Sequence, residues 1–222
     1  MIASHARFGA SSLAASAVLF AIFPLVRPYF RMDPRVPEVT LAAAAPAVAS
    51  APWLIAHGLV TLGFLLLLLS LPTLYAVLAR AGAERRAWRA MLATAAGIAL
   101  VMPMLGVEIA AFPGIGRLYL DGHGEIAPMI AHLYRGPMML VFLGGLALLA
   151  AGSILFASII RRTGALSGTA GVIFAAGLTL WLPLLPPPVR IADGFLIGLG
   201  GLWLARSLWR AEPGAVAATA TV

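Results

Sequence analysis

The chain has 222 residues, of which 62% are hydrophobic and only 10% charged, and its formal net charge is +7. Soluble domains carry about a quarter of charged residues, so this composition excludes an ordinary soluble domain and indicates an integral membrane protein. The sequence contains no cysteine, which excludes disulfides, thiolate metal sites, iron–sulfur clusters and thiol redox chemistry. It also contains no lysine, which excludes a retinal Schiff base.

Apolar segments of spanning length recur along the chain and predict an all-α bundle of about six transmembrane helices. The expected spans are residues 11–26, 52–79, 91–112, 137–160, 165–185 and 191–208. We expect one domain over residues 1–210 and a disordered, Ala/Thr-rich cytoplasmic tail over residues 211–222. Kinks are expected at Pro72 and Pro103.

The connecting segments differ in character. Residues 31–51 are rich in proline, which breaks helical hydrogen bonding, so they are expected to form a linker. Residues 80–90 are expected to form a short basic loop, and residues 114–124 a polar loop after a helix stop at Pro113. Residues 125–135 place apolar side chains at helical spacing, and this predicts a short helix in the outer membrane interface.

The distribution of arginine predicts the orientation. One set of ends carries nine arginines and the other carries six, and the positive-inside rule then places both termini in the cytoplasm. The nine are Arg7, Arg80, Arg85, Arg86, Arg89, Arg161, Arg162, Arg206 and Arg210. Because these arginines sit at helix ends, the positive charge does not indicate nucleic-acid binding. Exclusive use of arginine with abundant alanine and glycine favours a bacterial origin and hence the bacterial plasma membrane.

Glu108 and His57 are the leading site candidates on the predicted outer side. A carboxylate within a span is costly and usually has a partner, so Glu108 is expected to accept a proton, bind a cation or contact a substrate. The alternative is an interfacial glutamate paired with Arg117 or Arg135. His57 is expected to act as a general acid or base, bind a metal or contact Glu108. The alternative is a packing histidine beside Trp53, which is itself expected in the interfacial aromatic belt.

Three further residues are weaker candidates. Asp193 is a candidate catalytic carboxylate, but its place after three prolines also suits a helix N-cap. His132 lies on the polar side of the expected interfacial helix, and His123 lies in a turn-forming sequence. Arg27 and Arg190 are interpreted as interface anchors.

The cofactor is not determined by the sequence. His57, Glu108 and His132 are the candidate metal ligands, since two histidines and a carboxylate suit a catalytic zinc site. A bis-histidine haem would need His132 to fold inward toward His57. Motifs for nucleotide binding and for a nucleophilic serine are absent.

Three functions therefore stand as hypotheses. The first is a module that binds a small molecule or ion in an outward-facing polar pocket. The second is an accessory or structural subunit of a larger membrane complex or homo-oligomer, assembled through the Gly194–Gly198 face. The third is an acid/base enzyme acting on a small lipophilic ligand. The short multi-span chain with isolated carboxylates is similar to small integral-membrane terpene cyclases, and this likeness would make Glu108 and Asp193 the carboxylates that start and quench a cation cascade.

Overall fold

The structure is a computed structural model that describes residues 2–30, 37–126, 136–182 and 185–211. For residues 2–6 and 37–41 it describes the backbone alone. The interfacial helix expected at 125–135, together with His132 and Arg135, lies almost wholly outside these ranges. The tail expected at 211–222 also lies outside them, apart from its first residue.

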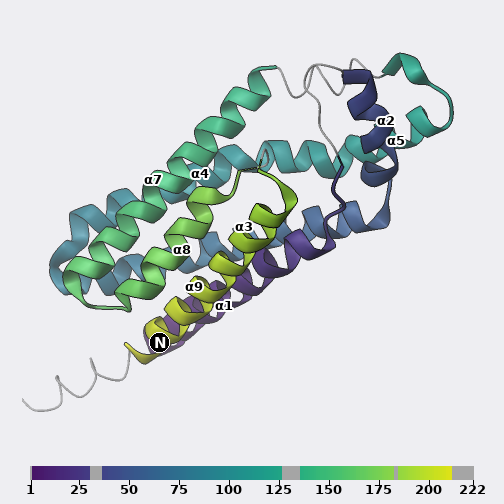
Figure 1. Ribbon diagram of the computed structural model, residues 1–222. Helices are drawn as coiled ribbons and strands as arrows, with labels where there is room; N and C mark the ends of the chain where they lie inside the picture. The colour runs from purple at the N-terminus through teal and green to yellow at the C-terminus, as the bar shows by residue number, and fades with distance from the viewer. Residues whose placement is uncertain (1, 31–36, 127–135, 183–184, 212–222) are drawn as a thin grey trace, which may run out of the picture.

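All regular elements in the described ranges are helices (Figure 1). The long ones are α1 (Ile2–Val26), α3 (Ala51–Leu78), α4 (Glu84–Ala110), α7 (Pro137–Thr163) and α9 (Pro187–Arg210). The shorter ones are α2 (Pro37–Val48), η1 (Ala79–Ala83), α5 (Phe112–Leu120), η2 (Gly124–Ile126) and α8 (Gly168–Leu180). The predicted all-α fold is confirmed for this part of the chain.

Six of these helices form a closed ring in chain order. Helix α1 packs on α3, α3 on α4, α4 on α7, α7 on α8 and α8 on α9, and α9 returns to α1. Helices α2 and α5 pack on each other at one end of the ring, toward the right of Figure 1. The N-terminus and the end of α9 lie at the opposite end.

Four segments are long and apolar enough to cross a membrane: Arg7–Val26, Ala51–Leu120, Pro137–Thr163 and Pro187–Arg210. The second contains both α3 and α4, which meet at η1, where Gly82 has a φ of 82°. Glycine adopts this left-handed conformation without a steric cost, so the chain can turn there from one helix into the next. Helix α8 is apolar but has only 13 residues.

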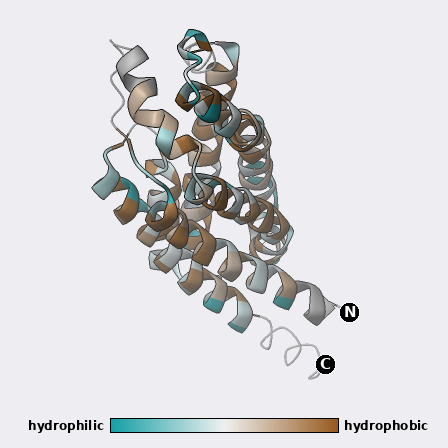
Figure 2. Cartoon of the chain, turned by 90° about the vertical axis from the view of Figure 1, so that its right-hand side faces the viewer, coloured by the Kyte–Doolittle hydropathy of each residue, from teal (hydrophilic) through white to brown (hydrophobic). Residues whose placement is uncertain are grey.

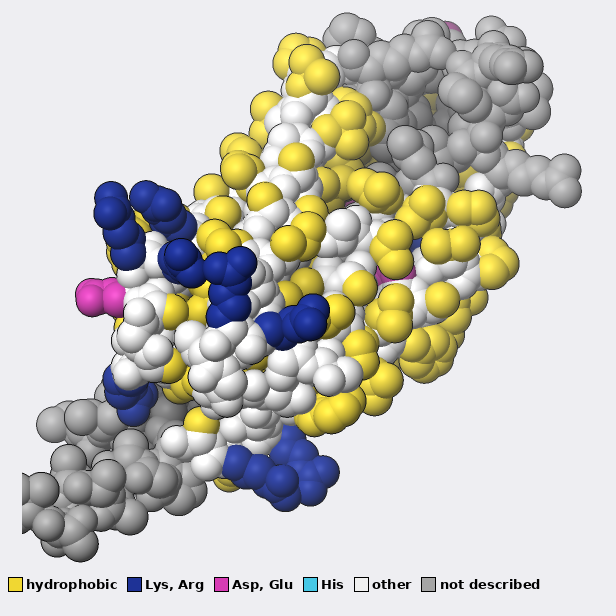
Figure 3. Space-filling view, turned by 60° about the vertical axis from the view of Figure 1, so that its left-hand side comes forward, with side chains coloured by type: hydrophobic (Ala, Val, Ile, Leu, Met, Phe, Trp, Pro, Cys, Tyr) yellow, Lys and Arg dark blue, Asp and Glu magenta, His cyan; other side chains and the backbone are white. Residues whose placement is uncertain are grey.

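Large apolar side chains are exposed along the sides of the bundle. On α3 alone, Leu62, Leu65 and Leu69 are each about half exposed. Figure 2 shows hydrophobic residues along the helices, and Figure 3 shows hydrophobic side chains beside a group of arginines gathered at one end. Soluble proteins rarely expose apolar surface on this scale, so the chain is a multi-pass membrane protein in contact with a lipid bilayer.

Glycines set the spacing of the ring. A Cβ on Gly97 would lie 2.5 Å from the backbone nitrogen of Leu149, so α4 and α7 meet backbone to backbone. The Gly194–Gly198 face packs in the same way against α1, with Pro24 and Ala21 as neighbours. The expectation that this face is an assembly surface is therefore wrong, because α1 of the same chain occupies it.

Several expected loops are helical. Residues 31–51, expected to form a linker, contain helix α2. Pro37 does not prevent this helix, because it is the first residue of α2, where proline costs no helical hydrogen bond. Helix α4 ends at Ala110, close to the stop expected at Pro113, but the polar loop expected at 114–124 is wrong up to Leu120, because Pro113 lies in the first turn of α5. The basic loop expected at 80–90 is wrong from Glu84 onward, where α4 begins.

Candidate functional site

Four ionisable side chains are buried among the described residues: His57, Glu108, Arg190 and Asp193. All four lie toward the end of the ring that carries α2 and α5, near the start of α3, the end of α4 and the start of α9. The other buried polar side chains in the described part are hydroxyl groups. Four of the reactive side chains that the sequence places on one side of the membrane therefore lie inside the bundle, toward one of its ends.

His57 and Glu108 converge from α3 and α4. The distance from His57 Nε2 to Glu108 Oε2 is 3.5 Å, and the side chains are 2% and 12% exposed. Sequence reasoning placed both residues near the outer face but could not show that they face each other. The structure brings them together.

Trp53 links the two residues. Its indole N–H donates to the backbone carbonyl of Glu108 at 2.8 Å, and its ring lies 4.0 Å from the His57 ring, centroid to centroid. Trp53 is fully buried, so its expected place in an interfacial belt is wrong. The physical reason is that Trp53 and His57 are four residues apart and share one helix face, which here points inward.

The hydrogen bond of the second imidazole nitrogen fixes the tautomer of His57. Nδ1 lies 2.7 Å from the backbone carbonyl of Trp53. A carbonyl only accepts, so Nδ1 carries the hydrogen, and the Nε2 of a neutral ring then presents a lone pair to Glu108. An ionised carboxylate would present another lone pair. One proton between Nε2 and Oε2 removes this conflict, whether it resides on the histidine or on the glutamate.

Arg190 and Asp193 form the α9 part of the cluster. They are 6% and 2% exposed, respectively, and Arg190 interacts electrostatically with both Asp193 and Glu108. Asp193 is not an N-cap, because α9 begins at Pro187 and places Asp193 in its second turn. Its Oδ1 is buried without a hydrogen-bond partner. The interpretation of Arg190 as an interface anchor is also wrong, since Arg190 is 6% exposed and its guanidinium lies over the Phe23 ring inside the bundle.

Arg27 and Tyr29 close the cluster at the end of α1. The Arg27 guanidinium lies over the Trp53 ring at 5.1 Å and the Tyr29 ring at 5.4 Å, and its buried Nε has no hydrogen-bond partner. Tyr29 donates to the carbonyl of Pro24 at 2.9 Å. Burial raises the pKa of Tyr29, against the opposing effect of Arg190 and Arg27.

The remaining candidates stand apart from this cluster or outside the described residues. His123 Nδ1 pairs with Glu125 at 3.1 Å, and both side chains are more than half exposed. The pKa of Glu125 is lowered by its own backbone N–H and by His123. Arg117 donates from Nε to the carbonyl of Pro113. His132 lies outside the described ranges.

A metal site of the expected composition is not assembled by the described residues. Among them, no three His, Asp or Glu side chains gather closely enough to hold a metal ion. The expected third ligand, His132, is not described, so the proposed set of His57, Glu108 and His132 stays a prediction.

Sequence reasoning missed the roles of Trp53, Arg27, Tyr29 and Arg190. The spacing of these residues in the sequence indicated part of the arrangement. Trp53 and His57 are four residues apart, and Arg190 and Asp193 are three apart, so each pair shares a helix face. Two large hollows in the structure, of about 860 Å³ and about 580 Å³, are lined by other residues.

Comparison of the chain with protein-family models, curated proteins and solved structures gives no match.

Proposed function

We propose that this multi-pass membrane protein binds and releases a proton at the His57–Glu108 pair, as a small-ion-binding module that opens to the outer side. The observation that carries the proposal is the pairing of His57 Nε2 with Glu108 Oε2 at 3.5 Å while Nδ1 is held by the Trp53 carbonyl. In this geometry the pair needs one shared proton. Release of that proton leaves two lone pairs facing each other.

The energetic cost of the cluster supports a functional role. Burying ionisable groups costs several kcal/mol per charge, and well-packed apolar residues of similar volume often stabilise a protein as well or better. The buried Oδ1 of Asp193 and Nε of Arg27, both without hydrogen-bond partners, add to that cost. Stability alone therefore gives little reason to retain this cluster.

The path of the proton follows from the packing. Arg190 interacts electrostatically with both Glu108 and Asp193, so it is the group that connects the α4 carboxylate to the α9 carboxylate. We propose that Glu108 or His57 takes up the proton and that the buried carboxylate of Asp193 is a second acceptor. Glu108 and Asp193 would also serve the alternative acid/base enzyme, so a test of this proposal must distinguish a bound proton from a converted substrate.

We further propose six membrane crossings, one each by α1, α3, α4, α7, the α8 region and α9, within a single domain over residues 1–210. The arginine-rich ends, including both termini, would lie in the cytoplasm of a bacterial cell. The gathering of Arg85, Arg86 and Arg89 next to Thr163 at one end of the ring supports this arrangement. The cluster would then face the outer leaflet.

The test is infrared difference spectroscopy of the purified protein through a pH titration. We expect a carboxyl band that titrates in the wild type, disappears in Glu108→Gln and shifts in His57→Gln. The exposed pair provides the matched control, because Glu125→Gln and His123→Gln change the same residue types and should leave that band unchanged.

Other outcomes would redirect or reject the proposal. A stoichiometric metal that is lost in both His57→Gln and Glu108→Gln would replace the proton by a cation. A lipophilic molecule that is converted by the wild type and not by Asp193→Asn would favour the enzyme. If the Glu108 and His57 variants have wild-type spectra and the protein co-purifies with other membrane subunits, the proton site is refuted and the accessory function is favoured.

A further inference from the structure

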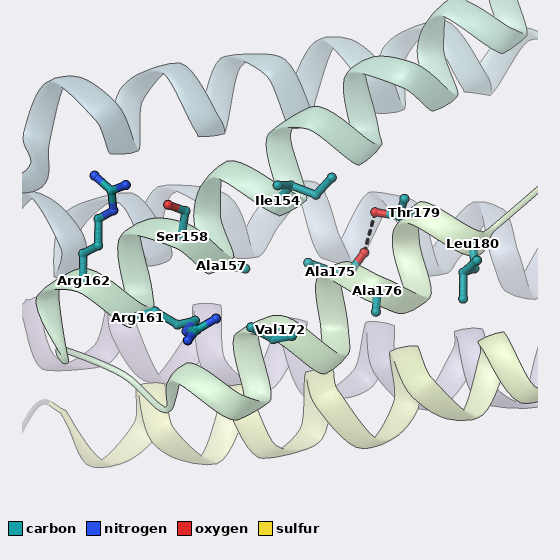
Figure 4. A pocket seen from close by; sticks show the side chains of 10 residues that line it. All are labelled: Ile154, Ala157, Ser158, Arg161, Arg162, Val172, Ala175, Ala176, Thr179 and Leu180. Carbon is teal, nitrogen blue, oxygen red and sulfur yellow. Dashed lines mark hydrogen bonds between the residues drawn. The ribbon is translucent and has the colours of Figure 1, made fainter.

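A groove between α7 and α8 has a volume of about 860 Å³. Figure 4 shows it as a cleft between the two helices, with Arg161 and Arg162 at one end and Leu180 at the other. Small side chains create the space, since Ala157 and Ser158 of α7 face Ala175 and Ala176 of α8.

The arginines are placed at the mouth of this groove by the α7–α8 turn. A Cβ on Gly168 would lie 3.0 Å from Arg161 Cγ, so the glycine allows the start of α8 to pass directly over the arginine stem. In Figure 4 the Arg161 side chain points between the two helices, and Arg162 projects from α7 on the same side as Ser158; both arginines line the groove. Both arginines are exposed.

We propose that this groove binds an anionic glycerophospholipid, with an acyl chain along the apolar walls and the phosphate at Arg161 and Arg162. Charge complementarity carries the choice of occupant: the walls are apolar, while the mouth holds two cations without a carboxylate among the lining residues. Guanidinium groups bind phosphate strongly and in two-point geometry.

The length of the groove favours a lipid over a partner helix. From Ile154 to Arg162, α7 rises about 12 Å at 1.5 Å per residue. The hydrocarbon of one leaflet is about 15 Å deep, half of the roughly 30 Å core, so an acyl chain of one leaflet matches this length along its whole extent, whereas a spanning helix would extend well past the groove. The groove therefore matches one leaflet, on the side where the arginine-rich ends gather.

The experiment is native mass spectrometry of the full chain in detergent, titrated with phosphatidylglycerol or with phosphatidylcholine of identical acyl chains. We expect tighter binding of phosphatidylglycerol. The double variant Arg161→Gln/Arg162→Gln should bind it about 30-fold more weakly, because each basic residue at a membrane surface contributes roughly a fivefold gain. Arg161→Lys/Arg162→Lys should keep most of the preference.

Two matched controls separate the groove from the general surface. Arg85→Gln/Arg86→Gln removes the same charge from another arginine-rich helix end and should leave phosphatidylglycerol binding unchanged. Ala176→Phe fills the groove and should abolish tight binding, whereas Ala151→Phe, at an exposed position of α7 outside the lining residues, should not.

Three results would overturn the proposal. Equal binding of the two lipids would remove the charge argument. An equal loss in the Arg85/Arg86 variant would assign the effect to general surface charge. A change of oligomeric state in Ala176→Phe with unchanged lipid binding would show that a second helix, and not a lipid, occupies the groove.

Discussion

Trp53→Phe probes the cluster without removing an ionisable group. The substitution deletes the indole N–H that donates to the Glu108 carbonyl at 2.8 Å, and it replaces the indole that packs against the His57 ring with a smaller ring. The lost hydrogen bond costs about 1 kcal/mol. The smaller ring at a fully buried position costs about 1–2 kcal/mol more through lost contacts and the space left behind.

We therefore expect the variant to be destabilised by about 2–3 kcal/mol, which for a chain of this size corresponds to a fall in Tm of about 5–10 °C. Thermal unfolding in mild detergent, followed by circular dichroism, measures this fall. Trp203→Phe is the control, because Trp203 is about half exposed and should tolerate the change with little loss. If the two variants lose equal stability, Trp53 does not tie α3 to α4, and the argument for a rigidly held His57–Glu108 pair fails.

Three further predictions test the packing, the tyrosine and the topology. Gly97→Ala should destabilise the protein by about 1–2 kcal/mol, since overpacking against the α7 backbone outweighs the gain in helix propensity, whereas Gly106→Ala, which meets open space, should be neutral or stabilising in the same thermal assay. Burial raises the pKa of Tyr29, so the contribution of this residue to stability is complete below the ordinary value near 10 and is lost as the pH rises through the higher folded value. A stability titration at alkaline pH should therefore show a loss of stability that Tyr29→Phe removes. The chain contains no cysteine, so single cysteines can be introduced without background: in intact cells an impermeant maleimide should label Asp121→Cys but not Ala83→Cys or Ala165→Cys, and labelling of all three would contradict the proposed crossings.

The helical class of the fold could be predicted from composition and apolar run length, because both depend on the membrane as a solvent and not on tertiary contacts. Residues 137–160, for example, were expected as a span, and α7 covers Pro137–Thr163. Proline-containing connections were harder. A proline breaks a helix only in its interior, and Pro37 and Pro113 both stand in a first turn. The sequence does not show whether a proline stands inside a helix or at its start.

For the candidate site, the sequence by itself predicts depth: Glu108 and His57 each lie about one turn from the end of an apolar segment, so both are expected near one face of the membrane. Only the tertiary structure decided that they point at each other, because the facing of α3 relative to α4 depends on contacts between distant parts of the chain, such as the Trp53–Glu108 hydrogen bond. The same holds for Arg190 and Asp193, whose place inside the bundle follows from the packing of Gly194 against α1. Hydropathy reports how deep a residue lies in the membrane, whereas the direction in which its side chain points is set by neighbouring helices.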